Sequence, residues 1–526
     1  MMMNARFEGY DGVGMMADVG GDQPNPAAPL LPGSGRPSMP EMVTSVNESA
    51  IGPWDRSADV IVVGQGIAGT CAALEAKRAG AEVLVIERAS GGGGASSTSA
   101  GVFYLGGGTD VQRACGYADS AENMAKFLLA NTSNPDEALL RRFCEGSVEH
   151  FHWLEAQGVP FERSGWPHKV FFPAGTECLF FTGNEKVWPY REIAEPVPRG
   201  HKAAGIGETG GAVAMNALLA RCEVLGIPAL YNSRVVALVV NGAGRVTGVR
   251  VRQGGAELHV QARRGVILAA GGFNLNEAMA RENIPLLSET SVPIGIPYND
   301  GGSILPGRSA GATVQSMDGV LATAPIYPPE QLIKGIIVNR SGVRFVAEDS
   351  YHGRVAQFAM EQLGQSAYLI VDSEIFTYPE MTACRHALID GWDTVAEMER
   401  GLGMPEGSLQ CTVDVYNRDA VAGIDTQFQK HADSLKPLDV GPYAAFDISF
   451  NKSIYVYMTL GGLRSGLNGE ALDSEGQPIG GLYAVGACAA HLSPKGDSYA
   501  SGLSLAPGSF FGRMAGRHAA GQVDAS

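Results

Sequence analysis

The sequence predicts an α/β protein in which a buried parallel sheet is interrupted by an inserted α+β domain. Three observations support this. An apolar strand, a glycine-rich turn, a helix and a second apolar strand follow one another in residues 59–87. Two later apolar runs, residues 266–270 and 481–486, also lead into glycine. Between these two runs, residues 291–440 change to short mixed strands and helices, which indicates a second unit with its own core.

The first unit reads as strand, helix and strand. Residues 60–63 are apolar and mostly β-branched, and the run is too short for a helix, so we expect a buried parallel strand. A helix rich in small alanines follows and ends at Gly80. A second apolar strand then covers residues 83–86.

The turn inside this unit predicts a dinucleotide site. Gly64, Gly66 and Gly69 have the spacing G-x-G-x-x-G. The first two let the backbone approach a pyrophosphate, the third lets helix and strand pack, and the helix N-terminus faces the phosphates with N–H groups. Glu87 follows the second strand and can accept hydrogen bonds from a ribose 2′-OH. A unit that binds nothing is the alternative, but three glycines would then only lower stability. The fold is therefore expected to be Rossmann-like.

Composition limits the other classes of function. With 526 residues, 45% of them apolar and 18% charged, the chain is expected to be globular and to hold two domains. A formal net charge of −16 argues against electrostatic binding of nucleic acid. Seventy glycines suit a fold with many tight turns and close contacts between backbone and ligand.

The eight cysteines are scattered, and no two have the spacing C-x-x-C. This argues against a zinc ribbon, an iron–sulfur cluster, a thioredoxin-type pair and a c-type haem site, and no metal site is expected. Single cysteines suit a reducing, cytoplasmic setting. No apolar run of about 18 residues is present, so no transmembrane helix is expected.

Residues 1–50 differ from the rest of the chain. They are rich in Met, Gly and Pro, and they lack the charged start and apolar core of a signal peptide. We expect a disordered or extended tail, with folded structure beginning near Trp54. The tail has no predicted role.

After Glu87, the glycine- and serine-rich residues 91–108 are expected to line a flat cofactor. No histidine lies between Arg88 and Glu149, so a covalent histidyl–flavin link is not available in this loop. Helices are expected over residues 121–158, interrupted at Asn134 and Pro135.

Further along, residues 161–211 are irregular and aromatic and could cover one side of a cofactor. A helix is expected at 212–225. Three meander strands at 234–240, 245–251 and 257–261 should precede the separate buried strand at 266–270. The last helix is expected at 504–520.

Five segments resemble the fumarate reductase/succinate dehydrogenase flavoprotein family: VVGQGIAG, GGGGASSTSAG, VILAAGG, GIIVNRSGVRFVAED and GGLYAVGACAA. Within that family, STSAGVFYLGGGTDVQRACGYADSAENM and DSYASGLSLAPGSFFGRMAG look most like the 3-ketosteroid Δ4-(5α)-dehydrogenases of actinobacterial steroid degraders. The resemblance implies non-covalent FAD, a steroid substrate and introduction of the C4–C5 double bond. It also implies a discontinuous FAD-binding domain, residues 51–290 and 441–526, and a catalytic domain at 291–440.

The cofactor-binding residues expected from the motif and the resemblance are Gly64, Gly66, Ile67, Ala68, Gly69, Glu87, Arg88, Gly94, Ala95, Ser96, Ser99, Ala100, Gly101, Val235, Ala270, Gly271, Gly272, Gly486, Ser504 and Leu505.

The resemblance also implies three catalytic positions. Tyr351, in EDSYHGR, matches a tyrosine of ketosteroid dehydrogenases where fumarate reductases carry an arginine, and Tyr499 and Ser501 match a Y-A-S motif. Asp497 and Ser498 stand where the family motif has glycines, which leaves the exact substrate open.

Desaturation beside a ketone needs removal of a C4 proton and hydride transfer from C5 to flavin N5. We expect Ser501 and Tyr351 to handle the proton, and Tyr499, with backbone N–H groups of residues 504–508, to bind the C3 carbonyl. A free tyrosine has a pKa of about 10 and needs help to act as a base. His352 and His491 are further candidate proton groups. We expect both of them to lie at the surface or to support the residues that touch the substrate.

Three rivals remain. A Δ1-ketosteroid dehydrogenase shares fold and cofactor, but its group usually ends in a Y-P-G-P-G type motif where this chain has Y-A-S-G. A fumarate reductase-like enzyme, acting on another enone or unsaturated acid, would want an arginine at Tyr351. A catalytically silent flavoprotein would show no bleaching with any steroid. The sequence leaves the electron acceptor, the oligomeric state, and the 5α or 5β and C17 preferences open.

Overall fold

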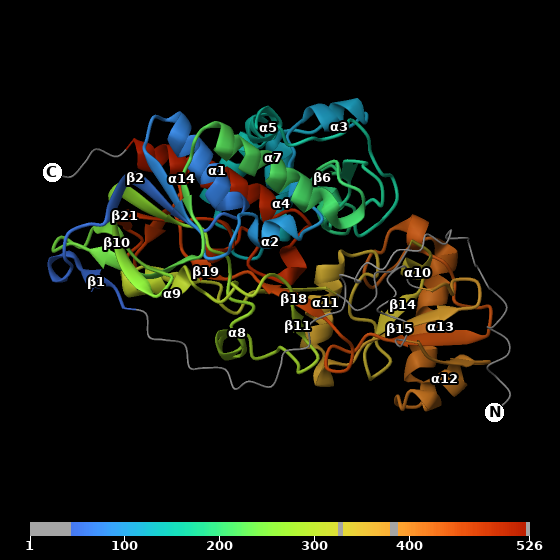
Figure 1. The fold of residues 1–526 in the computed structure, drawn as a ribbon. Coiled ribbons are helices and arrows are strands. Elements are labelled where there is room, and N and C mark those ends of the chain that lie inside the picture. Colours follow the sequence, from blue (N-terminus) through green and yellow to red (C-terminus); the bar gives the residue numbers. More distant parts are fainter. Residues whose placement is uncertain (1–43, 324–329, 379–387, 522–526) are drawn as a thin grey trace, which may run out of the picture. The chain divides into compact units, whose positions relative to one another are not determined.

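The computed structural model describes residues 44–323, 330–378 and 388–521 (Figure 1). Most of the expected N-terminal tail, residues 1–43, lies outside the described residues. Residues 46–47 form a strand that pairs with Val239 and Val240, so folded structure begins a few residues before Trp54.

The main sheet has nine strands in the order β1-β8-β9-β10-β2-β3-β7, with β21 paired to β10 and β20 paired to β21. The α/β class predicted from the sequence is confirmed. The strands are β1 (Val46–Asn47), β2 (Arg56–Val63), β3 (Val83–Ile86), β7 (Ala229–Leu230), β8 (Ser233–Val240), β9 (Val246–Gln253), β10 (Ala256–Leu268), β20 (Glu470–Leu472) and β21 (Pro478–Ala484).

The centre of this sheet is parallel and fully buried. Val266 of β10 lies opposite Ile61 of β2 on one side and Leu482 of β21 on the other, and all three are at most 1% exposed. Apolar runs without alternation form such strands because both faces are covered. The carboxyl ends of β2, β10 and β21 therefore meet at one edge, which brings their glycine turns together.

One strand expectation is wrong. Residues 257–261 and 266–270 were expected to be two strands, whereas a single strand, β10, runs through Ala256–Leu268 with an irregular register between Ala262 and Gly265. Arg263 and Arg264, in the gap between the two expected strands, belong to β10. Arg263 bonds to Asp59 at 2.8 Å, and Arg264 donates to the carbonyl of Ala520.

Helices α1 (Ile67–Arg78) and α14 (Leu505–Ala520) lie side by side next to the sheet (Figure 1). Small residues permit this, since a Cβ added at Gly512 would come within 2.4 Å of the Ala68 carbonyl oxygen. Helices α4 (Ala121–Asn131) and α5 (Glu137–Ala156) are separated around Pro135, as expected, and α7 (Gly210–Val224) matches the helix expected at 212–225.

The segment after residue 291 carries a four-stranded antiparallel sheet, in the order β14-β15-β17-β16, with its own apolar core. Its elements are β14 (Ile336–Val338), α11 (His352–Glu361), β15 (Tyr368–Asp372), β16 (Leu388–Trp392), α12 (Val395–Gly401), α13 (Ser408–Ala422) and β17 (Tyr443–Asp447). Strand β17 follows residue 440, the expected end of the insertion, and the domain bounds stay a prediction.

Shorter elements complete the described chain. They are α2 (Gly94–Ser97), β4 (Val102–Tyr104), α3 (Asp110–Ala114), β5 (Leu179–Phe180), α6 (Tyr190–Ile193), β6 (Gly200–Lys202), α8 (Glu277–Asn283), β11 (Val292–Pro293), α9 (Ile304–Ser309), β12 (Val314–Gln315), β13 (Val320–Thr323), α10 (Glu330–Ile333), β18 (Val456–Thr459) and β19 (Gly462–Leu463).

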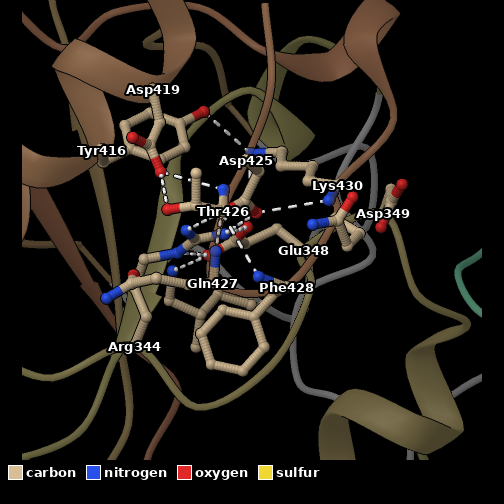
Figure 2. Close-up of polar contacts among 12 residues, drawn as sticks. Arg344, Glu348, Asp349, Tyr416, Asp419, Asp425, Thr426, Gln427, Phe428 and Lys430 are labelled. Atoms are coloured by element: carbon tan, nitrogen blue, oxygen red, sulfur yellow. Dashed lines mark hydrogen bonds and ion pairs between the residues drawn. The ribbon is translucent and has the colours of Figure 1, made fainter.

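A buried charge cluster holds the chain just before Tyr351 (Figure 2). The Arg344 guanidinium lies 2.8 Å from Glu348 and 2.9 Å from Asp425, and Lys430 lies 3.4 Å from Glu348. Burial alone would raise the pKa of Glu348, but Arg344 and Lys430 together hold it below its ordinary value. Two cations and two carboxylates thus compensate one another.

In the described part of the chain, no helix is long and apolar enough to cross a membrane. Seven cysteines there are free, and Cys384 lies outside the described residues.

Candidate active site

A cavity of about 540 Å³ opens at the carboxyl edge of the central parallel strands. All the cofactor residues expected from the sequence line it, with the exception of Gly69. A Cβ at Gly69 would lie 2.0 Å from the Gly64 carbonyl oxygen, so this glycine allows α1 to pack on the turn.

The turn between β2 and α1 forms one end of the cavity. Gly64 has a φ of +97°, and a Cβ there would lie 2.7 Å from the Ala269 carbonyl oxygen. Gly66 precedes the first turn of α1 and has no side chain to cap it. The N–H of Ile67 donates to Oγ of Ser96 at 3.1 Å, and Ile67 and Ala68 line the cavity, so the N-terminus of α1 borders it, which suits a phosphate.

Glu87 is held at the end of β3. Its carboxylate accepts hydrogen bonds from the backbone N–H of Gln65 at 2.7 Å and of Ala89 at 2.8 Å. Each oxygen keeps a further acceptor position for a ribose hydroxyl. Arg88, beside it, pairs with Asp300 at 2.6 Å and lies over the Tyr298 ring.

The cavity suits a dinucleotide carrying a flat ring system. Its glycine turns leave no room for side chains, and the small residues of α2 and the following loop line the wall, as expected from residues 91–108. Nε2 of His491 lines the same cavity and has no hydrogen-bond partner among the described residues. A buried polar atom of this kind fits a site that receives a ligand.

The structure brings Tyr351, Tyr499 and Ser501 together at the cavity wall. The hydroxyl oxygens of Tyr351 and Ser501 lie 3.0 Å apart, and the rings of Tyr351 and Tyr499 are 6.5 Å apart. Both tyrosines are at most 5% exposed. A hydrogen bond therefore joins Tyr351 and Ser501, which are 150 positions apart in the sequence.

Local backbone geometry places these side chains. Tyr351 is the residue before α11, and its carbonyl accepts hydrogen bonds from the N–H groups of Arg354 and Val355. The N–H of Ser501 donates to the Thr182 carbonyl at 3.0 Å. Gly502, with a φ of +101°, lets the chain pass against β4, since a Cβ there would lie 2.4 Å from the Tyr104 nitrogen.

Burial sets the protonation of the two tyrosines. It raises the pKa of Tyr351 above the ordinary tyrosine value, although the hydrogen bond from Ser501 acts in the opposite direction. Burial, followed by the neighbouring Tyr351, raises the pKa of Tyr499 well above its usual range. Both side chains are therefore neutral hydroxyl groups near neutral pH, able to donate and accept hydrogen bonds.

The two histidines that were further candidates for proton transfer, His352 and His491, also line this cavity. The ring centre of His352 lies 3.9 Å from that of Tyr351. Burial lowers the pKa of His352 to about 3 and that of His491 to about 4. Both imidazoles are uncharged at neutral pH.

A second cavity of about 900 Å³ also reaches Tyr351 and Ser501. It is lined by charged side chains, including Lys169 and Glu185. Burial lowers the pKa of Lys169 to about 8 and raises that of Glu185 above its ordinary value. The Tyr351–Ser501 pair thus borders an apolar cavity and a more polar one.

Several lining residues were not expected from the sequence. Apart from Gln65, which lies in the glycine turn, they come from irregular segments or from the short strands β13 and β18, which give no periodic signal: Gln65, Asn274, Ile294, Ile296, Tyr298, Asn299, Asp300, Leu321, Thr323, Val456, Met458 and Thr459. The glycine pair following Asn299 and Asp300 was the one available cue. Phe171 and Phe172, within the irregular segment expected to cover a cofactor, also line the cavity. Tyr104 of β4 does not line this cavity. Its hydroxyl donates a hydrogen bond to Glu185 at 3.0 Å.

Comparison with known proteins agrees with this geometry. Residues 59–496 match the family model described as FAD binding domain. A 3-oxo-5-alpha-steroid 4-dehydrogenase of Comamonas testosteroni is 30% identical over 499 residues, covering 82% of this chain and 93% of that protein. A probable fumarate reductase of Shewanella frigidimarina is 28% identical and covers 90% of this chain and 76% of its own.

Among solved structures, the 3-ketosteroid-Δ4-(5α)-dehydrogenase of Rhodococcus jostii RHA1, in complex with 4-androstene-3,17-dione, is similar to this chain. The TM-score is 0.86 and the sequence identity 40%, and the match covers 91% of this chain and 100% of that one.

Proposed function

Since the chain belongs to the FAD-binding domain family of flavoproteins, whose cofactor fits the cavity, we propose that it dehydrogenates a 3-oxosteroid between C4 and C5. The observation that carries the proposal is the Tyr351–Ser501 hydroxyl pair, 3.0 Å apart and buried at the wall of the cofactor cavity. The similarity to steroid 4-dehydrogenases over most of the chain supports the substrate class.

The residues of the dinucleotide end would hold FAD without a covalent link. Glu87 would accept a ribose hydroxyl, and the N-terminus of α1 would face the pyrophosphate. When bound, FAD supplies the acceptor for the C5 hydrogen and its electron pair at flavin N5. The C4 hydrogen leaves as a proton, and the electron pair of its C–H bond forms the second C4–C5 bond as the C5 hydrogen departs with its own pair.

Removal of the C4 proton falls to Ser501 and Tyr351 in this proposal. Their hydroxyls are close enough for one to accept a proton while the other donates. Burial keeps Tyr351 in its neutral form, so the pair would pass a proton on to the second, polar cavity, which both residues also line, rather than hold a permanent negative charge.

The C3 carbonyl is assigned to Tyr499 and to the start of α14. A neutral phenol can donate a hydrogen bond, and Ser504 and Leu505, at the N-terminus of α14, line the same cavity. Donors aimed at this oxygen make the neighbouring C4 hydrogen more acidic as negative charge develops. Apolar wall residues such as Leu321 and Met458 suit a steroid skeleton.

The test is an anaerobic titration of the flavin-loaded protein with 5α-androstane-3,17-dione. We expect stoichiometric bleaching of the oxidised flavin band and 4-androstene-3,17-dione as product, identified by mass spectrometry against standards. A 1-ene product would assign the chain to the Δ1 reaction instead. No bleaching with the steroid, together with reoxidation of dithionite-reduced flavin by fumarate, would favour a reductase of unsaturated acids.

A further inference from the structure

Two buried asparagine side chains lie behind the catalytic group and bond to each other. Asn131 ends α4, Asn184 follows β5, and they are 4% and 0% exposed. Nδ2 of Asn184 donates to Oδ1 of Asn131 at 3.0 Å. Buried amides are expensive unless they are fully hydrogen-bonded, so their other contacts show what this pair is built around.

Those contacts go to the backbone that carries the catalytic side chains. Oδ1 of Asn184 accepts a hydrogen bond from the N–H of Tyr351 at 2.9 Å. Nδ2 of Asn184 also donates to the carbonyl of Asp497 at 3.1 Å, and Nδ2 of Asn131 donates to the carbonyl of Ser498 at 2.6 Å. The pair therefore joins Tyr351 to the two residues just before Tyr499.

The orientation of the Asn184 amide is fixed by its partners. Its oxygen meets an N–H donor, and its two N–H donors meet two oxygen acceptors. Rotating the amide by a half-turn would place a donor against a donor at Tyr351, and an acceptor against an acceptor at Asn131 and Asp497. Three of the four hydrogen-bonding directions of Asn184 are used, including both donors, and they link segments far apart in the sequence.

We propose that Asn131 and Asn184 are positioning residues for the dehydrogenation, and we name the pair the amide clasp. This inference rests on the proposed function. Tyr351 stands at the start of α11, whereas Tyr499 and Ser501 belong to the C-terminal segment, so their 3.0 Å hydroxyl contact depends on how the two backbones are held. Misplacement by about 1 Å lowers rates by about 100-fold in enzymes generally.

The first variant, Asn184→Leu, removes every hydrogen bond that this residue makes. We expect kcat per bound flavin to fall about 10- to 100-fold, the steroid KM to change less than about threefold, and the flavin content to stay at wild-type level. Unchanged kcat per bound flavin, with only a lower melting temperature, would overturn the proposal.

A matched control is available in α13. Nδ2 of Asn417 donates to the Leu438 carbonyl at 2.9 Å, and the N–H of Leu438 donates to Oδ1 of Asn417 at 2.7 Å. Asn417 thus ties α13 to Leu438 through two side-chain hydrogen bonds, outside both cavities. Asn417→Leu is expected to lower the melting temperature and leave kcat per flavin unchanged. An equal loss of kcat in both variants would also overturn the proposal.

The second variant, Asn184→Asp, keeps the shape of the side chain and tests its donors. When ionised, the carboxylate has no donor and faces the oxygens of Asn131 and Asp497, so its pKa should be raised. When protonated, it recovers one donor. The titratable groups around it are Glu185, Tyr351 and the Asp497 side chain, and burial raises the pKa of all three.

We therefore expect the ratio of variant to wild-type kcat to rise as the pH is lowered from 8 to 6. A purely structural role would leave this ratio flat, and a flat ratio would count against the clasp. If Asn184→Leu does not fold, the pH dependence of kcat in Asn184→Asp still tests the proposal.

Hydrogen exchange gives a readout that does not depend on turnover. In Asn184→Leu, which removes the acceptor of the Tyr351 N–H, the amide of Tyr351 should exchange at least about tenfold faster than in the wild type, and unchanged protection would overturn the clasp. A wild-type protein that protects this amide but does not oxidise the steroid would contradict the proposed function. The two failures are therefore distinguishable.

Discussion

Removal of the two paired hydroxyls, singly and together, tests the proposed chemistry most directly. The perturbations are Tyr351→Phe, Ser501→Ala and the double variant. Each single change deletes one partner of the 3.0 Å contact and leaves the cofactor end of the cavity intact. Loss of a group that moves a proton lowers kcat by about 10²- to 10⁴-fold, which is about 3 to 5 kcal/mol in the barrier.

The effect on stability should be much smaller. A neutral hydrogen bond contributes about 0.5 to 1.5 kcal/mol to folding, so the Tyr351→Phe protein should remain folded and loaded with flavin. The matched control is Tyr455→Phe. Tyr455 is also fully buried, and its hydroxyl donates to the Ile448 carbonyl, outside both cavities. This control should lose a similar amount of stability and keep its kcat.

If the hydroxyls act as one unit, the double variant should be about as slow as the slower single variant, because the second deletion removes nothing that still works. The assay is steady-state turnover of 5α-androstane-3,17-dione with a dye as electron acceptor, normalised to bound flavin. Multiplicative losses would show that the residues act independently. Turnover near the wild-type value in either single variant would remove that residue from the mechanism.

Three further predictions concern the cofactor end, the charge cluster and the histidines. Glu87→Gln should raise the Kd for FAD at least about tenfold, measured by equilibrium dialysis, because an amide nitrogen replaces one of two acceptors that meet backbone N–H groups. Glu348→Gln should lower the free energy of unfolding at pH 7 by about 3 to 5 kcal/mol. The pKa of Glu348 is held below its ordinary 4.5, so its stabilisation is present above that pH and fades as the pH falls further; urea unfolding at pH 7 and pH 4 should show a smaller difference between variant and wild type in acid. Since burial lowers the pKa of His352 to about 3 and of His491 to about 4, kcat/KM should show no step near pH 6.5. A step there that vanishes in His491→Asn would contradict this assignment.

Much of the main sheet could be predicted because its central strands are short apolar runs that end in glycine. The strand at residues 60–63, the helix ending at Gly80 and the strand at 83–86 all appear in the structure. The division of β10 failed for a physical reason. The strand continues through Arg263 and Arg264 because their charges are satisfied by Asp59, Glu82 and the Ala520 carbonyl at the end of α14.

The end of the candidate site that would bind the dinucleotide could be predicted from the sequence, whereas much of the opposite wall could not. Glycine turns at strand ends reveal the dinucleotide end, because few other side chains fit there. The opposite wall uses Leu321, Met458 and Thr459, ordinary residues of short strands. Nothing in their spacing marks them, since their place depends on how the inserted segment packs. The asparagines of the amide clasp could not be predicted from the sequence either, because most of their partners are backbone groups far along the chain.

This division makes cofactor binding and reaction separable in the chain. The contacts expected with FAD come mostly from turns whose geometry is set by the parallel sheet, whereas the proposed proton chemistry depends on one 3.0 Å contact between two segments that meet only in the folded protein. A change at residues 351, 499 or 501 should therefore leave a flavin-loaded protein that lacks turnover. A change at Gly64, where a Cβ would meet the Ala269 carbonyl oxygen at 2.7 Å, should instead abolish flavin binding together with turnover.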